Sequence, residues 1–142
     1  MKIQLQEILS KNSDLEAVWR ILTEKSEKTV WVGGGVRNLL LGLDAADFDL
    51  ATSLTPDEII ESARQNGWYA DLVGASFGVV VIRSGEETIE VAGFRREGYG
   101  EDPHRPTWVE YGASLEEDLS RRDFTINGMA LTMDGILIDL FV

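Results

Sequence analysis

Two aspartates stand two residues apart in a segment that the sequence predicts as a β-strand, and they are the first candidates for chemistry. Asp47 and Asp49 flank Phe48. On a strand, side chains at positions i and i+2 project from the same face, so both carboxylates can reach one metal ion while Phe48 points to the core. Carboxylate oxygens are the ligands of hard cations such as Mg²⁺, and such sites serve phosphoryl transfer. An Asp-x-Asp pattern is also common on solvated strands and in turns, so the pair alone leaves both interpretations open.

A run of three glycines, Gly33 to Gly35, follows a predicted strand at residues 29–32 and precedes a predicted helix that carries Arg37. Glycine lets the backbone approach a phosphate closely, a helix N-terminus presents free N–H groups, and arginine adds a fork of donors. These features favour a triphosphate held close to the two aspartates. A tight strand-to-helix turn made for backbone reasons is the alternative. The motif is neither a Walker loop nor a dinucleotide fingerprint, because the lysine of the first and the spaced glycines of the second are absent.

Further polar candidates lie in a predicted strand at residues 88–91 and in a charged segment near the C-terminus. Glu90 takes the opposite face of its strand from its apolar neighbours, so it is either a solvent-facing acid or a third carboxylate of the site. In the C-terminal segment, Arg122, Asp123 and Asn127 surround a predicted helix boundary. Asp123 and Asn127 are spaced to share one helix face, although exposed helix charges usually only interact with water.

The composition restricts the kinds of site that are possible. The chain has no cysteine and a single histidine, His104, so a metal here is held by oxygen, which favours Mg²⁺, Mn²⁺ or Ca²⁺. A formal net charge of -12 argues against a broad nucleic-acid-binding surface on this segment alone. An RNA substrate would therefore need other residues to hold it. No apolar run is long enough to span a membrane and the N-terminus does not resemble a signal peptide, so we expect an unexported, cytoplasmic protein.

The elements that must position these residues alternate between helix and strand. With 142 residues, one domain with its own core is expected. Predicted helices cover the first 28 residues, with a possible capping box at Ser13 and Glu16, and then residues 36–41, 55–66, a stretch from 114 and residues 125–131. Predicted strands cover residues 29–32, 47–51, 69–73, 78–82, 88–91 and 136–141, and a loop rich in Gly, Pro and charge covers 95–113. The expected fold class is α/β (α+β).

Two long motifs in the correct order carry a family resemblance. VGGGVRNLLLGLDAADFDLAT at residues 32–52 and SLEEDLSRRDFTINGMAL at residues 114–131 resemble the class II tRNA nucleotidyltransferases, which are the CCA-adding enzymes and the related bacterial poly(A) polymerases. The resemblance covers nearly the whole chain. It implies a DNA polymerase beta-like nucleotidyltransferase fold, a small mixed sheet with flanking helices, over residues 1–142 as a head domain. We expect the neck, body and tail domains of the family to be absent from this chain.

The resemblance also implies roles for individual residues. The implied catalytic residues are the acids Asp47, Asp49 and Glu90, of which Asp47 and Asp49 bind Mg²⁺ or, alternatively, Mn²⁺. The implied nucleotide-binding residues are Gly33, Gly34, Arg37, Arg122, Asp123 and Asn127. Asn38 departs from the family pattern, which normally has aspartate there.

The implied reaction is attack of an RNA 3′-hydroxyl on the α-phosphate of ATP or CTP, with release of pyrophosphate. The implied partners are ATP, CTP and the 3′ end of tRNA or another RNA, which other domains mainly hold, and no membrane. CCA addition is favoured over poly(A) addition. Two further alternatives are a nucleotide-binding module without catalysis and a nucleotidyltransferase for small molecules. The RRDFTIN segment disfavours the small-molecule enzyme.

Overall fold

The computed structural model describes residues 5–26, 28–42, 48–73, 79–85, 87–99, 106–111, 114–115, 118 and 129–139. The helices are α1 (Gln6–Lys11), α2 (Ser13–Lys25), α3 (Gly34–Leu40) and α4 (Pro56–Gln65). The strands are β1 (Val30–Val32), β2 (Asp49–Thr52), β3 (Tyr69–Val73), β4 (Val79–Ser84), β5 (Glu87–Gly93), β6 (Arg95–Tyr99), β7 (Pro106–Tyr111), β8 (Met129–Thr132) and β9 (Leu137–Asp139). None of the helices in the described part is long and apolar enough to cross a membrane.

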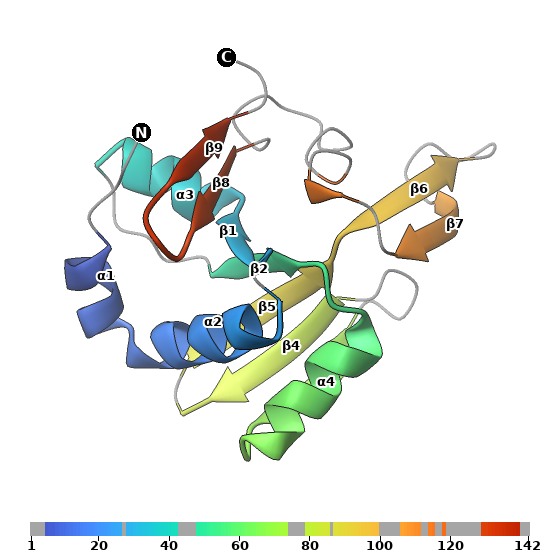
Figure 1. The fold of residues 1–142 in the computed structure, drawn as a ribbon, viewed down its shortest axis with the longest axis horizontal. Coiled ribbons are helices and arrows are strands. Elements are labelled where there is room, and N and C mark those ends of the chain that lie inside the picture. Colours follow the sequence, from blue (N-terminus) through green and yellow to red (C-terminus); the bar gives the residue numbers. More distant parts are fainter. Residues whose placement is uncertain are drawn as a thin grey trace.

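A seven-stranded sheet in the order β3-β4-β5-β2-β1-β8-β9 forms the centre of the molecule (Figure 1). The pair β2–β5 is parallel, and the other neighbouring pairs are antiparallel. The chain leaves β2, passes through α4 and the meander β3–β4, and returns as β5 beside β2. This crossover is what allows two strands far apart in the sequence to run side by side in the same direction.

Helices cover one face of the sheet. Trp31, Leu50 and Ile89 point from β1, β2 and β5 into a core that is built with residues of α1, α2, α3 and α4. Trp19 of α2 meets Trp31 edge-on, with ring centroids 6.1 Å apart and planes inclined by 76°. Edge-to-face packing of this kind is a favoured geometry for aromatic rings. The opposite face carries a smaller cluster with Val32, Ala51, Phe94 and Ala130 among its members.

Two helices begin in different ways. At α4, Thr55 Oγ1 accepts the N–H of Glu58 at 3.3 Å and the Glu58 carboxylate accepts the N–H of Thr55 at 3.0 Å, a complete capping box. The predicted capping box at Ser13 and Glu16 is wrong, since α2 has no side-chain cap of its own. The N–H of Leu15 instead donates to the Glu87 carboxylate of β5 at 3.1 Å. A distant strand thus supplies the acceptor that the first turn of α2 needs.

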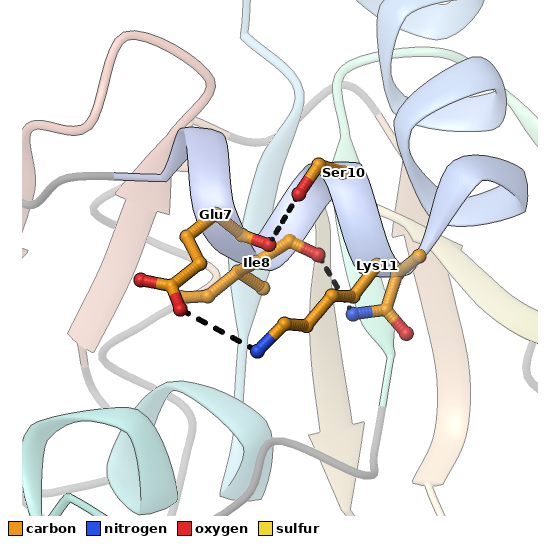
Figure 2. A network of polar contacts seen from close by, with 5 residues as sticks. Glu7, Ile8, Ser10 and Lys11 are labelled. Carbon is orange, nitrogen blue, oxygen red and sulfur yellow. Dashed lines mark hydrogen bonds and ion pairs between the residues drawn. The ribbon is translucent and has the colours of Figure 1, made fainter.

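Local polar contacts hold α1 and explain why Asn12 does not cap α2. Ser10 Oγ donates to the carbonyl of Glu7 at 2.8 Å, and Lys11 Nζ lies 3.4 Å from Glu7 Oε1 (Figure 2). The side-chain amide of Asn12 donates backward to the carbonyl of Ile8 at 2.8 Å. Because this amide satisfies the C-terminus of α1, it is turned away from the helix that follows.

Two predictions for the C-terminal half are wrong. The predicted loop at residues 95–113 contains β6 and β7, which pair as an antiparallel hairpin with an irregularity between Gly98 and Tyr99. The predicted helix at residues 125–131 is a strand over its described part, because β8 begins at Met129 and pairs with β1. Residues 125–128 lie outside the described residues.

Candidate active site

Strand register brings two of the candidate carboxylates together. Asp49 at the start of β2 is the Cα partner of Glu90 in the parallel strand β5, and on its other side it is the partner of Val32 at the end of β1. The N–H of Glu90 donates to the carbonyl of Phe48 at 3.1 Å, which holds β5 in place just before Asp49. Partners in adjacent strands project from the same face, so Asp49 and Glu90 lie side by side.

This pair belongs to the face of the sheet opposite the helices. Leu50, the next residue after Asp49, is buried in the core on the helix side. Phe48, the residue before it, packs against the same core, and its ring lies 5.9 Å from the ring of Trp31. The prediction that Phe48 points to the core is therefore confirmed. Asp49 is half-buried and Glu90 is exposed.

The glycine turn lies against the Asp49 carboxylate. Gly33 follows the last residue of β1 and has φ 82° and ψ -150°, a region that glycine adopts and side-chain-bearing residues rarely do. A Cβ placed on Gly33 would lie 3.4 Å from Oδ2 of Asp49. The backbone of the turn therefore lies close to the Asp49 carboxylate, and the predicted approach of this turn to a phosphate stays a prediction.

The helix that begins at this turn carries the predicted arginine. α3 starts at Gly34, and the N–H of Arg37 donates to the carbonyl of Gly33 at 3.2 Å, which closes the first turn of the helix. Arg37 is half-buried. Among the described residues its guanidinium has no ion pair. The turn thus places the N–H groups of the first residues of α3 next to Gly33 and close to Asp49, and Arg37 belongs to this helix.

A network of buried hydroxyl groups fixes the other ends of the two strands that carry this turn and Asp49. The hydroxyls of Thr29, before β1, and Thr52, at the end of β2, share a hydrogen bond of 2.8 Å, and both residues are buried. Thr29 also donates to the carbonyl of Ser26 at 2.9 Å, and the hydroxyls of Ser26 and Ser53 are hydrogen-bonded. Nothing in the sequence identified these residues as a support for the site.

The remaining predicted site residues, Asp47, Arg122, Asp123 and Asn127, lie outside the described residues. Within the described part, no group of three or more His, Cys, Asp or Glu side chains is arranged to hold a metal ion. Asp49 and Glu90 are the predicted acids that the structure places, and they supply oxygen donors on one face.

The sequence family agrees with this geometry. The model of the poly A polymerase head domain matches residues 29–142, which include the glycine turn and both carboxylate strands. The chain belongs to the poly A polymerase head domain family. The CCA-adding enzyme of Bacillus cereus (strain G9842) is 40% identical to this head domain over 120 residues, which are 84% of the chain and 29% of the relative.

Solved structures support the same assignment. A CCA-adding enzyme from Bacillus stearothermophilus in complex with CTP has a TM-score of 0.75 and 33% identity, over 91% of this chain and 29% of that one. A tRNA nucleotidyltransferase complexed with a primer tRNA and an incoming ATP analog has a TM-score of 0.65 and 35% identity, over 87% of this chain and 34% of that one. The resemblance to nucleotidyltransferases and the predicted fold class are confirmed. The head domain spans less than a third of the length of the curated relative it matches.

Proposed function

We propose that this head domain is the nucleotide-transferring part of a CCA-adding enzyme, which moves CMP and AMP from CTP and ATP to the 3′ end of tRNA. The observation that carries the proposal is the juxtaposition of the Asp49 and Glu90 carboxylates with the glycine turn at Gly33. Support also comes from similar enzymes whose structures contain CTP, or a primer tRNA and an ATP analog. These features do not require either of the other two alternatives, a nucleotidyltransferase for small molecules or a nucleotide-binding module without catalysis.

In this proposal the acids hold a divalent cation. Asp47 and Asp49 are the proposed ligands of Mg²⁺ or Mn²⁺, with Glu90 as the third acid beside them. The donor set fits, because carboxylate oxygens are the ligands that hard cations prefer and the register of β2 with β5 places the Asp49 and Glu90 side chains next to each other. When bound, the cation neutralises phosphate charge and activates the attacking hydroxyl.

The other proposed contacts concern the nucleotide. Backbone N–H groups at Gly33 and Gly34 and the guanidinium of Arg37 would hold the triphosphate at the start of α3. The residues proposed to shape the rest of the nucleotide pocket are Arg122, Asp123 and Asn127. In the reaction, a bond forms between the RNA 3′-oxygen and the α-phosphorus, and the bond from that phosphorus to the pyrophosphate oxygen breaks. Pyrophosphate leaves, and the hydroxyl proton passes to solvent.

Calorimetric titration of CTP and ATP into the purified chain tests the proposal, with Mg²⁺ present and after its removal with EDTA. We expect binding that requires Mg²⁺ and that is lost in an Asp49→Asn variant. Glu61→Gln is a suitable control, because it neutralises an exposed acid of α4 on the helix side of the sheet. If the unaltered chain bound neither nucleotide, the proposed function would be wrong for this chain.

Poly(A) addition is a second candidate, because the family model that matches the chain is that of the poly A polymerase head domain. The two activities differ in their products. Incubation of the active protein with all four nucleoside triphosphates and a tRNA lacking its 3′ end, followed by sequencing of the product, separates them. A short defined addition of C and A supports CCA addition, and a long run of A supports the poly(A) alternative.

A further inference from the structure

The open face of the sheet continues beyond the two carboxylates onto β4 and β3. Glu90 pairs with Val81 of β4, which pairs with Asp71 of β3, so one row of side chains runs from Asp49 to the edge of the sheet. The next row on the same face consists of Thr88, Arg83 and Tyr69. Side chains two residues apart on a strand are separated by about 7 Å, so Arg83 lies one row away from Glu90.

Arg83 and Tyr69 form an exposed cation and ring on this face. The Arg83 guanidinium carbon lies 5.6 Å from the centre of the Tyr69 ring, and the Tyr69 hydroxyl donates to Asp71 Oδ2 at 3.2 Å. Tyr69 is 57% exposed, and Arg83 is exposed as well. Within the part of the chain that the structure describes, Arg83 has no carboxylate as an ion-pair partner. Its charge is therefore directed at the ring and the solvent, in a chain whose net charge is -12.

The stereochemistry of phosphoryl transfer determines from which side a second substrate approaches. The attacking and leaving oxygens lie roughly in line on opposite sides of the reacting phosphorus. The proposed triphosphate site at Gly33 and α3 adjoins the β1 side of Asp49, so the pyrophosphate leaves toward that side. The attacking hydroxyl then arrives from the other side, where β5, β4 and β3 follow in order.

We propose that the last nucleotides of the RNA acceptor lie across β5, β4 and β3, with Arg83 at a backbone phosphate and the Tyr69 ring stacked on a base. This inference rests on the proposed function. Single-stranded nucleic acid is commonly held by a cation that contacts the backbone and an aromatic ring that stacks on a base, and this combination tolerates any base. Arg83 and Tyr69 form this combination on the face that holds the carboxylates.

The expected effects follow from these two contacts. Loss of the Tyr69 ring or of the Arg83 charge should each weaken RNA binding by roughly tenfold. Removing a phosphate contact should also reduce the salt dependence of binding, by about 0.7 in the slope of log affinity against log salt for single strands. CTP binding should be unchanged in both cases, because neither residue lies on the Gly33 side of Asp49.

The test uses a fluorescent single-stranded RNA that ends in CC and carries 4-thiouridine just upstream of these bases. Its binding to the chain is measured by fluorescence anisotropy at several salt concentrations, with Mg²⁺ and a non-hydrolysable CTP analogue present. The variants are Arg83→Gln and Tyr69→Ala, with Tyr69→Phe to retain the ring. Arg20→Gln removes the same charge from α2, on the helix side, and is the matched control. Photo-crosslinking followed by mass spectrometry maps the contact on the protein.

Crosslinks to β3 or β4, with weaker binding in Arg83→Gln and Tyr69→Ala but not in Tyr69→Phe or Arg20→Gln, would support the proposal. Equal losses in Arg83→Gln and Arg20→Gln, crosslinks confined to other elements, or no RNA binding by the unaltered chain would overturn it. A dimer that dissociates in Tyr69→Ala would assign the face to a second copy and also contradict it. Separate titration with CTP distinguishes these outcomes from failure of the proposed function, which would abolish nucleotide binding itself.

Discussion

Leu50 and Asp49 are neighbours in β2, yet they lie on opposite faces of the sheet and experience different surroundings. The Leu50 side is covered by helices and filled with large apolar side chains, including two tryptophans. The Asp49 side carries a smaller buried cluster, with Val32, Ala51, Phe94 and Ala130 among its members, next to the two carboxylates. The comparison indicates that the helix face holds the larger part of the buried apolar core, while the opposite face is only partly buried and carries the polar side chains of Asp49 and Glu90.

The largest effect is expected from truncation on the helix face. Leu50→Ala removes a fully buried side chain from the core and should lower the free energy of unfolding by about 2–5 kcal/mol. Chemical denaturation monitored by circular dichroism measures this change. Leu72→Ala in β3 is a matched control, because Leu72 is 43% exposed and its truncation should lower the free energy of unfolding far less. Equal losses at the two positions would contradict the proposed difference between core and surface.

The adjacent substitution on the open face should separate activity from stability. Asp49→Asn should reduce pyrophosphate release by roughly 100-fold or more, comparable to removal of one preorganised group in other active sites. Its effect on the free energy of unfolding should stay within about 1 kcal/mol, because the side chain is half-buried and similar in size. Kinetics and denaturation on the same sample test both parts. A large loss of stability would mean that Asp49 supports the fold.

A smaller effect is expected at the glycine turn. Gly33→Ala should cost about 1–3 kcal/mol of backbone strain at φ 82°, and its new methyl group should weaken nucleotide binding beside Asp49 Oδ2. Gly67→Ala is the control, since Gly67 has φ 76° but nothing within 4 Å of an added Cβ. Both variants should be destabilised in thermal melts, and only Gly33→Ala should bind CTP more weakly. If the two variants bound CTP equally well, Gly33 would not belong to the proposed nucleotide site.

The smallest expected effect is a gain in stability instead of a loss. Ser62 on the buried side of α4 is 3% exposed, and its hydroxyl has no hydrogen-bond partner among the described residues. Because an unpaired buried hydroxyl is destabilising, Ser62→Ala should raise the free energy of unfolding by up to about 1 kcal/mol. Ser84→Ala, also buried but bonded to Asp14 at 3.3 Å, should lower it. Denaturation curves of the two variants measure both changes in the free energy of unfolding. A lower free energy of unfolding in Ser62→Ala would contradict the explanation.

Local signals in the sequence predicted much of the fold. β3 has the predicted bounds of residues 69–73, and α4 begins with the predicted capping box, because alternation and capping depend on residues close together in the chain. Tertiary contacts decided the rest. The first turn of α2 is satisfied by Glu87, which no local pattern could indicate. Residues 129–131 are Met, Ala and Leu, good helix formers, yet pairing with β1 makes them a strand.

The candidate site shows the same division between local and distant information. Spacing alone placed Phe48 in the core and Asp49 on the opposite face, and the glycine turn was identified from its position between strand and helix. Spacing left Glu90 as either a solvated acid or a site residue, since only the register of β2 with β5 places it beside Asp49. The hairpin β6–β7 was missed because its Gly, Pro and charged residues are typical of loops.

The parallel pairing of β2 with β5 also has a consequence for how the chain folds. Asp49 and Glu90 become neighbours only after the chain has completed α4, β3 and β4 and returned alongside β2. Contacts between distant segments form late and slowly in folding. A nascent or partly folded chain therefore contains both carboxylates without containing their shared site. The two carboxylates therefore come together only when the crossover closes, which makes their pairing a marker of complete folding.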